Sequence, residues 1–446
     1  MKTLIKNAKI LNEENCKTGS LLIENDTIKK IIWGELKEDI IADQIIDADD
    51  KTLMPGVIDD QVHFREPGLT HKGDIHSESR AAVAGGITSY MEMPNTLPQA
   101  VTQEELQKKY DIAAESSIAN YSFHMGATNE NLDEVLKTDK KNVCGVKVFM
   151  GSSTGNMLVD NPETLTEIFS NCELIISSHC EDEATVKGNT AGYKDKFGKD
   201  IPFKYHPEIR SAEACYKSSS KAAELAHKTG ARLHILHLSS AKEMEIFSNK
   251  LPLSEKKVTG EACIHHMWFT DKDYDKKGAF IKWNPAIKYE EDREAIREAV
   301  NNNTIDVIAT DHAPHTLEEK SNDYFHAPSG GPLVQHALPA MLEMYHQGIF
   351  TLEKIVEKMC HHPAILFEVE KRGFIREGYK ADLVLVDLNE EWKVTDSNIL
   401  YKCGWSPFTG DTFRSKIKAT FVNGKIVYDG KNIIEAGFGE RLTFDR

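Results

Sequence analysis

Residues 55–64, PGVIDDQVHF, join an apolar run to an acidic pair, a glutamine and a single histidine. A short run of this kind, bounded by Pro-Gly before it and by REPG after it, predicts a buried β-strand. His63 falls at the end of that strand, and Gln61 occupies the same face two residues earlier. Barrel enzymes build their sites from side chains at the ends of buried strands, so this stretch predicts both a fold and a place for chemistry.

The pattern recurs seven more times along the chain. The further candidate strands are GITSYMEMP (86–94), ANYSFHMGA (119–127), CGVKVFMGS (144–152), ELIISSHCE (173–181), ARLHILHLS (231–239), KVTGEACIHH (257–266) and IDVIATDHAP (305–314). Amphipathic helical patterns lie between most of them, for example at 104–117, 218–229 and 289–302. Eight alternating β/α units predict an α/β fold, a (β/α)8 TIM-like barrel spanning residues 55–373.

The two ends of the chain have a different texture. Residues 1–54 and 374–446 read as short strands separated by turn signals such as Asn423-Gly424. Neither end is long enough to form a stable domain alone. We therefore expect them to pair into one small β-sandwich module beside the barrel.

Composition excludes several classes of partner. The formal net charge of −16 argues against nucleic acid, because phosphate binding needs a basic surface. The N-terminal MKTLIKNAKI lacks the apolar core of a secretory signal, and no apolar run is long enough to span a bilayer. The eight cysteines include no CxxC pair, so we expect reduced thiols and a cytoplasmic protein.

Reactive side chains sit at or just after the predicted strand ends more often than a chance scatter of 18 histidines would place them. They are His63, Asn95, Lys147, His179, His237, Asp311 and His315. Imidazole and carboxylate are ligands that zinc prefers, and a catalytic zinc site keeps one position open for water. Taken together, these residues predict a metal centre.

Lys147 is the unusual member, since it stands among apolar residues in VKVF. Burial lowers the pKa of an amine, and a neutral amine can add carbon dioxide to form a carbamate whose oxygens bind cations. A salt bridge between Lys147 and Asp311 or another acid fits this stretch equally well. Likewise, Arg65 could pair with Glu66 or Asp60 at the surface, and Asn95 could simply cap a turn.

Six ordered segments resemble the motif series of dihydroorotases, members of the amidohydrolase superfamily of metal-dependent barrel hydrolases. They are PGVIDDQVHFREPG (55–68), AAVAGGITSYMEMPNT (81–96), ISSHCED (176–182), LHILHLSS (233–240), WNPAIKYEEDREAIREAV (283–300) and IDVIATDHAPH (305–315). The resemblance implies metal ligation by His63, a carbamylated Lys147, His179, His237 and Asp311. It implies that Arg65, Asn95 and His315 bind the substrate carboxylate and, from a looser alignment of the loop APSGGP, that Asn284, Ser329 and Gly330 contact the ring.

Gln61 departs from the family pattern, which has a histidine at this position. An amide oxygen is a weak zinc ligand, so the metal position served by His63 and Asp311 should be weakened. The position served by Lys147, His179 and His237 keeps its whole ligand set. We therefore expect one well-occupied Zn²⁺ site there, with a partial or absent second site beside Gln61.

The activity implied by the resemblance is the reversible, metal-dependent cyclisation of N-carbamoyl-L-aspartate to L-dihydroorotate, in pyrimidine (UMP) biosynthesis, with Asp311 as the proton-transferring catalytic residue. Two alternatives stay open. One is another cyclic amidohydrolase, a hydantoinase or allantoinase, whose substrates give Arg65 less purpose. The other is a catalytically silent homologue that serves as a scaffold for aspartate transcarbamoylase. The reason to consider it is Gln61, which stands where the family pattern has a histidine. The chain could form a homo-oligomer, and the loop at 315–332 is long enough to act as a lid.

Overall fold

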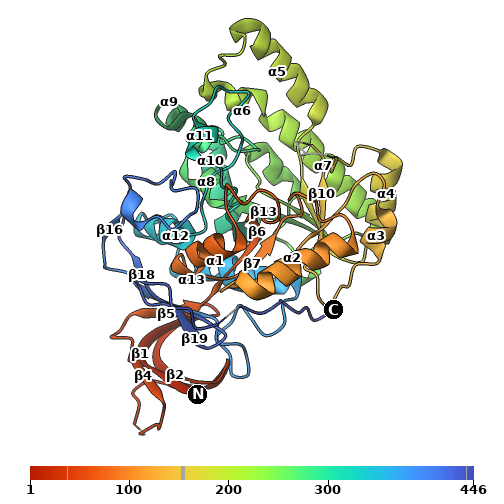
Figure 1. Ribbon diagram of the computed structural model, residues 1–446. Coiled ribbons are helices and arrows are strands. Elements are labelled where there is room, and N and C mark those ends of the chain that lie inside the picture. Colours follow the sequence, from red (N-terminus) through yellow and green to blue (C-terminus); the bar gives the residue numbers. More distant parts are fainter. Residues whose placement is uncertain (38, 152–155, 438) are drawn as a thin grey trace.

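The computed structural model describes residues 1–37, 39–151, 156–437 and 439–446, and its central body is a barrel of parallel strands ringed by helices (Figure 1). The barrel strands are β6 (Val57–Val62), β7 (Ile87–Glu92), β8 (Asn120–Phe123) with its continuation β9 (Met125–Gly126), β10 (Val146–Phe149), β11 (Ile176–His179), β12 (Leu233–Ile235), β13 (Val258–Cys263) and β14 (Val307–Ala309). Neighbours pair in parallel from β6 to β8 and from β9 to β14. A parallel bridge between Val62 and His312 closes the ring, which confirms the predicted (β/α)8 architecture.

The helices around the barrel follow from ordinary capping chemistry. In α7 (Ala212–Thr229), the Ser211 side chain accepts a hydrogen bond from the Ala214 N–H, and Gly230 ends the helix in the left-handed region, with φ at 80°. The other helices are α1 (Ile75–Ala84), α2 (Gln103–Ser116), α3 (Leu132–Leu136), α4 (Pro162–Asn171), α5 (Glu183–Phe197), α6 (His206–Ile209), α8 (Ile264–Trp268), α9 (Tyr274–Lys277), α10 (Glu290–Asn301), α11 (Leu317–Lys320), α12 (Ala337–His346), α13 (Leu352–Val356) and α14 (His362–Phe367). Apolar residues of α1, α2, α4, α7, α10 and α12 pack with the strands in one large core, whereas those of α14 and α6 lie in two smaller clusters.

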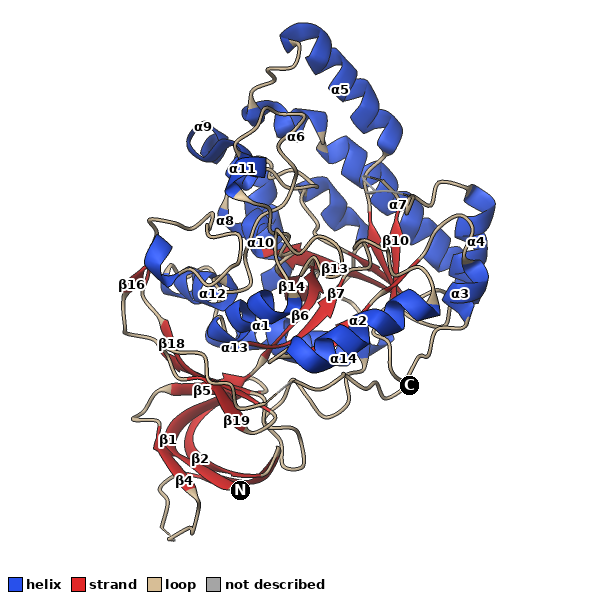
Figure 2. Cartoon of the chain, viewed as in Figure 1, coloured by secondary structure: helices blue, strands red, loops and turns tan. Residues whose placement is uncertain are grey.

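Both chain ends meet in a second sheet, seen as the group of strands at the lower left of Figure 2. Its strands are β1 (Lys2–Asn12), β2 (Asn15–Glu24), β3 (Thr27–Trp33), β4 (Gln44–Asp47), β5 (Thr52–Pro55), β15 (Leu383–Asp387), β18 (Lys416–Val422) and β19 (Lys425–Tyr428). The N-terminal β5 pairs antiparallel with the C-terminal β15, so the two ends form one module, as the sequence predicts. Leu21, Leu53, Leu383 and Phe421 are among the residues of its separate apolar core.

The C-terminal part also reaches beyond this module. Between β15 and β18 the chain forms the small hairpin β16 (Trp392–Lys393) and β17 (Thr412–Phe413) and a loop that packs on the barrel. In that loop the Trp405 Nε1–H donates to the carbonyl oxygen of His315, at 2.7 Å. The final residues run along the barrel, where the Leu442 N–H donates to the Tyr121 carbonyl oxygen at 2.9 Å. The domain boundaries after residues 54 and 373 therefore stay a prediction, because the C-terminal segment also contacts the barrel.

Across the described residues, no helix is both long enough and apolar enough to cross a membrane. All eight cysteines are free thiols, and six of them are buried in the core.

Candidate metal and substrate site

A cavity of about 300 Å³ opens at the carboxyl ends of the barrel strands. Every residue that the sequence analysis proposed as a ligand or substrate contact lines it. The lining residues are Gln61, His63, Arg65, Asn95, Lys147, Phe149, His179, His237, Trp283, Asn284, Asp311, Ala313, His315, Pro328, Ser329 and Gly330. A larger cleft of about 790 Å³ lies elsewhere, and its lining includes Glu13, Glu357 and Arg376 but none of these strand-end residues. The chemistry thus gathers in the smaller cavity.

His179 and His237 form the core of one candidate metal position. His179 ends β11, and its Nδ1 lies 2.9 Å from Nε2 of His237, which follows β12. Nε2 of His179 lies 3.0 Å from the Glu181 carboxylate, which is also bound by Arg210 at 2.6 Å. The carboxylate draws the imidazole proton to Nε2 and leaves a lone pair on Nδ1, facing His237. Burial lowers the pKa of both histidines, so both rings are neutral and able to ligate a cation.

His63 and Asp311 face each other on the opposite side of the cavity. Nε2 of His63 lies 3.1 Å from Oδ1 of Asp311, while Nδ1 of His63 lies 2.8 Å from Oδ1 of Asn95. An amide oxygen can only accept, so the His63 proton sits on Nδ1 and Nε2 carries the lone pair. Asn95 therefore orients His63 with its oxygen and keeps its amino group for another partner. The sequence analysis anticipated Asn95 as a substrate contact but not this orienting contact.

Gln61 occupies the space where a further ligand of the His63 position would stand. Its Nε2 donates to Oδ1 of Asp311 at 3.2 Å, and its Oε1 lies 3.9 Å from the Cys263 sulfur. The side chain thus presents an N–H donor, rather than a lone pair, to the shared carboxylate. A donor cannot ligate a cation, and the arrangement supports the expectation of an unequal pair of metal positions.

Lys147 is buried in β10, with 1% of its surface exposed and its Nζ 4.6 Å from the centre of the Phe149 ring. Burial lowers the pKa of its amine from 10.5 to about 8. The nearby charges of Asp311 and Glu261 oppose that shift without cancelling it. A neutral fraction of the amine is thus present near neutral pH, which is the form that reacts with carbon dioxide.

The backbone is strained at three residues of the cavity. Arg65, His237 and Asp311 have positive φ angles of 72°, 40° and 50°, a region that side chains other than glycine rarely adopt. Each stands just after a barrel strand, where an ordinary extended backbone would direct the side chain elsewhere.

Burial also raises the pKa of Asp311 to about 7, so this carboxyl can exchange a proton near neutrality.

Arg65 and His315 form the polar wall of the cavity. Nη2 of Arg65 lies 3.1 Å from Nε2 of His315, and Nε of Arg65 donates to the Pro314 carbonyl oxygen at 3.1 Å. Arg65 is 7% exposed and, among the described residues, forms no ion pair closer than 4 Å with Glu66 or Asp60. A buried guanidinium that faces a cavity without a carboxylate partner is suited to an anionic ligand.

The loop after α11 brings Ser329 and Gly330 to the cavity. The Ser329 hydroxyl donates to Oδ1 of Asn284 at 3.0 Å, so these two predicted contacts lie together. Gly330 has φ at 124°, and a Cβ there would lie 2.6 Å from the Ala313 carbonyl oxygen, so only glycine fits.

Two buried lysines that the sequence analysis did not single out hold this loop. Nζ of Lys320 donates to the carbonyl oxygens of Pro328 and Gly330, at 2.9 and 2.7 Å. Nζ of Lys282 donates to those of Tyr324 and Ala327, both at 2.6 Å. A lysine in a loop and one at the end of a short helix give no sequence signal for this role, because the anchored carbonyl groups belong to no motif.

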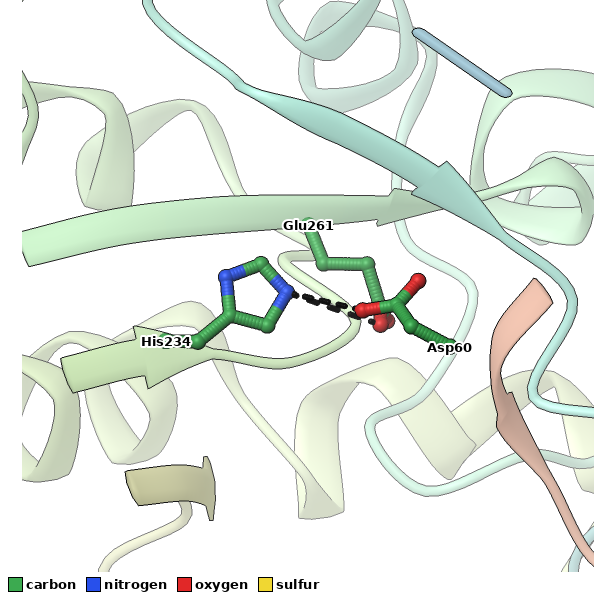
Figure 3. A group of neighbouring side chains, drawn as sticks. All are labelled: Asp60, His234 and Glu261. Carbon is green, nitrogen blue, oxygen red and sulfur yellow. Dashed lines mark ion pairs between the residues drawn. The ribbon is translucent and has the colours of Figure 1, made fainter. Parts of the chain in front are cut away.

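A further buried group, Asp60, His234 and Glu261, lies outside this cavity, between β6, β12 and β13 (Figure 3). His312, directly after Asp311, does not line the cavity, and its Nε2 lies 2.9 Å from the Glu78 carboxylate.

Comparison with known proteins places this geometry in a wider context. The model of the "Amidohydrolase family" matches residues 52–427. A protein named dihydroorotase from Halobacterium salinarum is 33% identical over 410 residues, which cover 92% of each chain. One of the same name from Pyrococcus furiosus is 32% identical and covers 99% of this chain and 96% of its own. Among solved structures, an L-hydantoinase (dihydropyrimidinase) from Arthrobacter aurescens superposes with a TM-score of 0.93 at 27% identity, over 99% of both chains.

Proposed function

This chain belongs to the amidohydrolase family, and we propose that it is a dihydroorotase, which interconverts N-carbamoyl-L-aspartate and L-dihydroorotate in pyrimidine biosynthesis. Relatives named dihydroorotase, at 30–33% identity over most of the chain, support this choice. The observation that carries it is that Arg65 and His315, a buried pair, line the same cavity as the candidate metal ligands. A cyclic substrate with a carboxylate fits both halves of that cavity.

We assign one well-occupied Zn²⁺ position to His179, His237 and a carbamylated Lys147, and a weak or absent one to His63 and Asp311 beside Gln61. The donor set fits a cation, because two neutral imidazoles turn toward each other and the Nδ1 of His237 has no hydrogen-bond partner among the described residues. Lys147 would gain a carboxylate by adding carbon dioxide to its neutral amine, with release of one proton. A cation held there supplies Lewis-acid polarisation of the scissile carbonyl and makes the attacking water more acidic.

Asp311 is the group that moves the proton. In ring opening, water attacks the carbonyl carbon of the ring amide, Asp311 accepts the proton of that water, and the C–N bond breaks as Asp311 returns the proton to the leaving nitrogen. A pKa of about 7 suits a residue that must accept and release a proton at neutral pH. Ring closure uses the same group in the opposite protonation state, with loss of water.

Arg65, Asn95 and His315 hold the substrate carboxylate, remote from the bond that breaks. Arg65 supplies a planar fork of N–H donors, and the free amino group of Asn95 adds another. Asn284, Ser329 and Gly330 line the same cavity and would contact the ring. Fixing the substrate at both ends orients the amide toward the water and Asp311.

A hydantoinase activity is the main competing function, because the L-hydantoinase superposes closely. Hydantoins lack the carboxylate, so Arg65→Met separates the two. We expect kcat/KM for dihydroorotate to fall ~10²-fold, since two hydrogen bonds to a charged group are lost, with hydantoin turnover unchanged. Arg232→Met, which removes a guanidinium bound to Glu368 far from the cavity, is the matched control. An unchanged dihydroorotate rate in Arg65→Met would contradict the proposal.

The scaffold alternative predicts no turnover at all. Purified, zinc-loaded protein given N-carbamoyl-L-aspartate should form dihydroorotate. Absence of ring closure with zinc, cobalt or manganese would favour a silent partner of aspartate transcarbamoylase.

The free cysteines support the cytoplasmic location expected from the sequence, and a homo-oligomer remains part of the same proposal.

A further inference from the structure

Three ionisable side chains converge inside the barrel, away from the substrate cavity. Asp60 on β6, His234 on β12 and Glu261 on β13 are all fully buried, at 0% exposure (Figure 3). Nε2 of His234 lies 3.2 Å from Oδ2 of Asp60 and 3.9 Å from Oε2 of Glu261. One ligand atom from each residue lies within 4.8 Å of the other two. None of the three lines the substrate cavity.

The proton on His234 is directed away from the two carboxylates. The Thr259 hydroxyl donates to the Leu233 carbonyl oxygen at 3.2 Å, so its oxygen accepts the bond from Nδ1 of His234 at 2.9 Å. The neutral ring therefore carries its hydrogen on Nδ1 and a bare lone pair on Nε2. That lone pair faces oxygens of Asp60 and Glu261, an arrangement that is repulsive unless something positive lies between them.

The carboxylates are also left without ordinary partners. Neither oxygen of Asp60 has a hydrogen-bond partner among the described residues, and the same is true of Oε2 of Glu261 and Nε2 of His234. The other oxygen of Glu261 is fixed, because it accepts from the His237 N–H at 2.8 Å and from the Cys263 thiol at 3.2 Å. Two buried carboxylates with unpaired oxygens carry a large desolvation penalty, which a cation bound between them would offset.

We propose that Asp60, His234 and Glu261 form a structural binding site for a divalent transition-metal ion such as Zn²⁺, separate from the metal position at the strand ends. Ligand atoms about 2.0–2.2 Å from a tetrahedral zinc ion are ~3.3–3.6 Å apart, and the two distances from Nε2 of His234, 3.2 and 3.9 Å, bracket that range. One imidazole and two carboxylates form a suitable donor set, and the Thr259 and Cys263 contacts fix the orientation of two of the ligands, as outer contacts do in metal sites. The ion would tie together three barrel strands that are distant in sequence.

Crystals of protein produced in zinc-supplemented medium, measured at the zinc absorption edge, test the site directly. We expect an anomalous peak between the three side chains, resolved from any peak in the substrate cavity. A peak in the cavity with none between Asp60, His234 and Glu261 would overturn the proposal and leave a shared proton as the explanation of the cluster.

Metal content in solution gives a second measurement. Asp60→Asn should lose about one zinc equivalent per chain relative to the wild type, whereas Lys147→Ala, which removes the cavity ligand, should retain one. Glu243→Gln is the matched control, because Glu243 is equally buried but accepts hydrogen bonds from Ser219, Ser240 and the Ser239 N–H. Equal zinc content in Asp60→Asn and Glu243→Gln would also overturn the proposal. If Asp60→Asn does not fold, the wild-type anomalous map decides alone.

Discussion

The two sides of the candidate metal centre differ in how completely they are built. On the β10–β12 side, His179 and His237 bring two ring nitrogens within 2.9 Å of each other, and Lys147 has a lowered pKa that suits carbamylation. On the β6 side, His63 faces Asp311, but Gln61 places an N–H donor on that carboxylate. We therefore propose that a single residue type on one strand makes one metal position strong and the other weak. The difference teaches that ligand count alone does not define a site, since the direction of each donor matters as much.

The largest expected effect comes from breaking the two sides in turn. His237→Asn should lower kcat ~10³-fold and remove about one zinc equivalent, that of the cavity, because several kcal/mol of transition-state stabilisation depend on that position. His63→Asn should lower kcat only ~10-fold and leave the zinc content unchanged. Steady-state kinetics and elemental analysis on both variants measure the contrast. Equal losses would mean that both positions are filled and needed.

Restoring the missing ligand should make the two sides more alike. In Gln61→His the hydrogen bond to Asp311 is replaced by a second imidazole lone pair, so a second zinc ion in the cavity should bind at least ~10-fold more tightly. Zinc titration against a competing chelator measures the change. Gln61→Asn, which shortens the amide without adding a ligand, is the control and should bind no second ion in the cavity. No gain in Gln61→His would show that Gln61 is not what weakens this side.

The pH dependence of reactivation tests the carbamylation of Lys147. With a pKa of about 8, the neutral fraction of Lys147 is ~10% at pH 7 and ~50% at pH 8, against ~0.03% at pH 7 for an ordinary lysine of pKa 10.5. Burial disfavours the charged form, so neutral amine increases as the pH rises. Metal-free protein freed of carbon dioxide should therefore regain activity ~5-fold faster at pH 8 than at pH 7, at constant dissolved carbon dioxide and zinc. A rate that is flat between these values would contradict carbamylation as the slow step.

The smallest expected effect lies outside both metal positions, in the lysine that holds the Ser329 loop. Lys320→Met leaves the Pro328 and Gly330 carbonyl groups without their donor, so KM should rise ~3-fold while bound zinc stays constant. Lys358→Met is the matched control, because Lys358 is also buried but donates to the Ile305 carbonyl oxygen away from the cavity. Both variants should lose stability in denaturant titrations. A KM change in the control alone would refute the role given to Lys320.

Periodicity and strand-end chemistry made the barrel and the lining of its cavity predictable. Apolar runs ending in His63, His179 or Asp311 leave few other folds, and the carboxyl ends of parallel strands must meet at one face. The left-handed backbone at Arg65, His237 and Asp311 had no such signal, because those residue types do not favour it.

Other features depend on contacts between distant parts of the chain. Asn95 orients His63 only because β6 and β7 lie side by side, and Lys320 holds its loop through backbone carbonyl groups that no motif marks. The Asp60, His234 and Glu261 group is brought together by barrel closure alone, so its members read separately as unrelated polar residues in apolar strands.

The Trp405 contact with His315 has a consequence for how this protein can be taken apart. Trp405 lies in the C-terminal segment, while β5 of the small module runs into β6 of the barrel with only Gly56 between them. At Gly56 any side chain would collide with Thr88, because a Cβ would lie 2.1 Å from its hydroxyl oxygen. Excision of residues 55–373 would therefore remove the Trp405 donor to the His315 carbonyl oxygen and separate β6 from β5. The small module and the barrel therefore cannot be separated without a change in the wall of the candidate site.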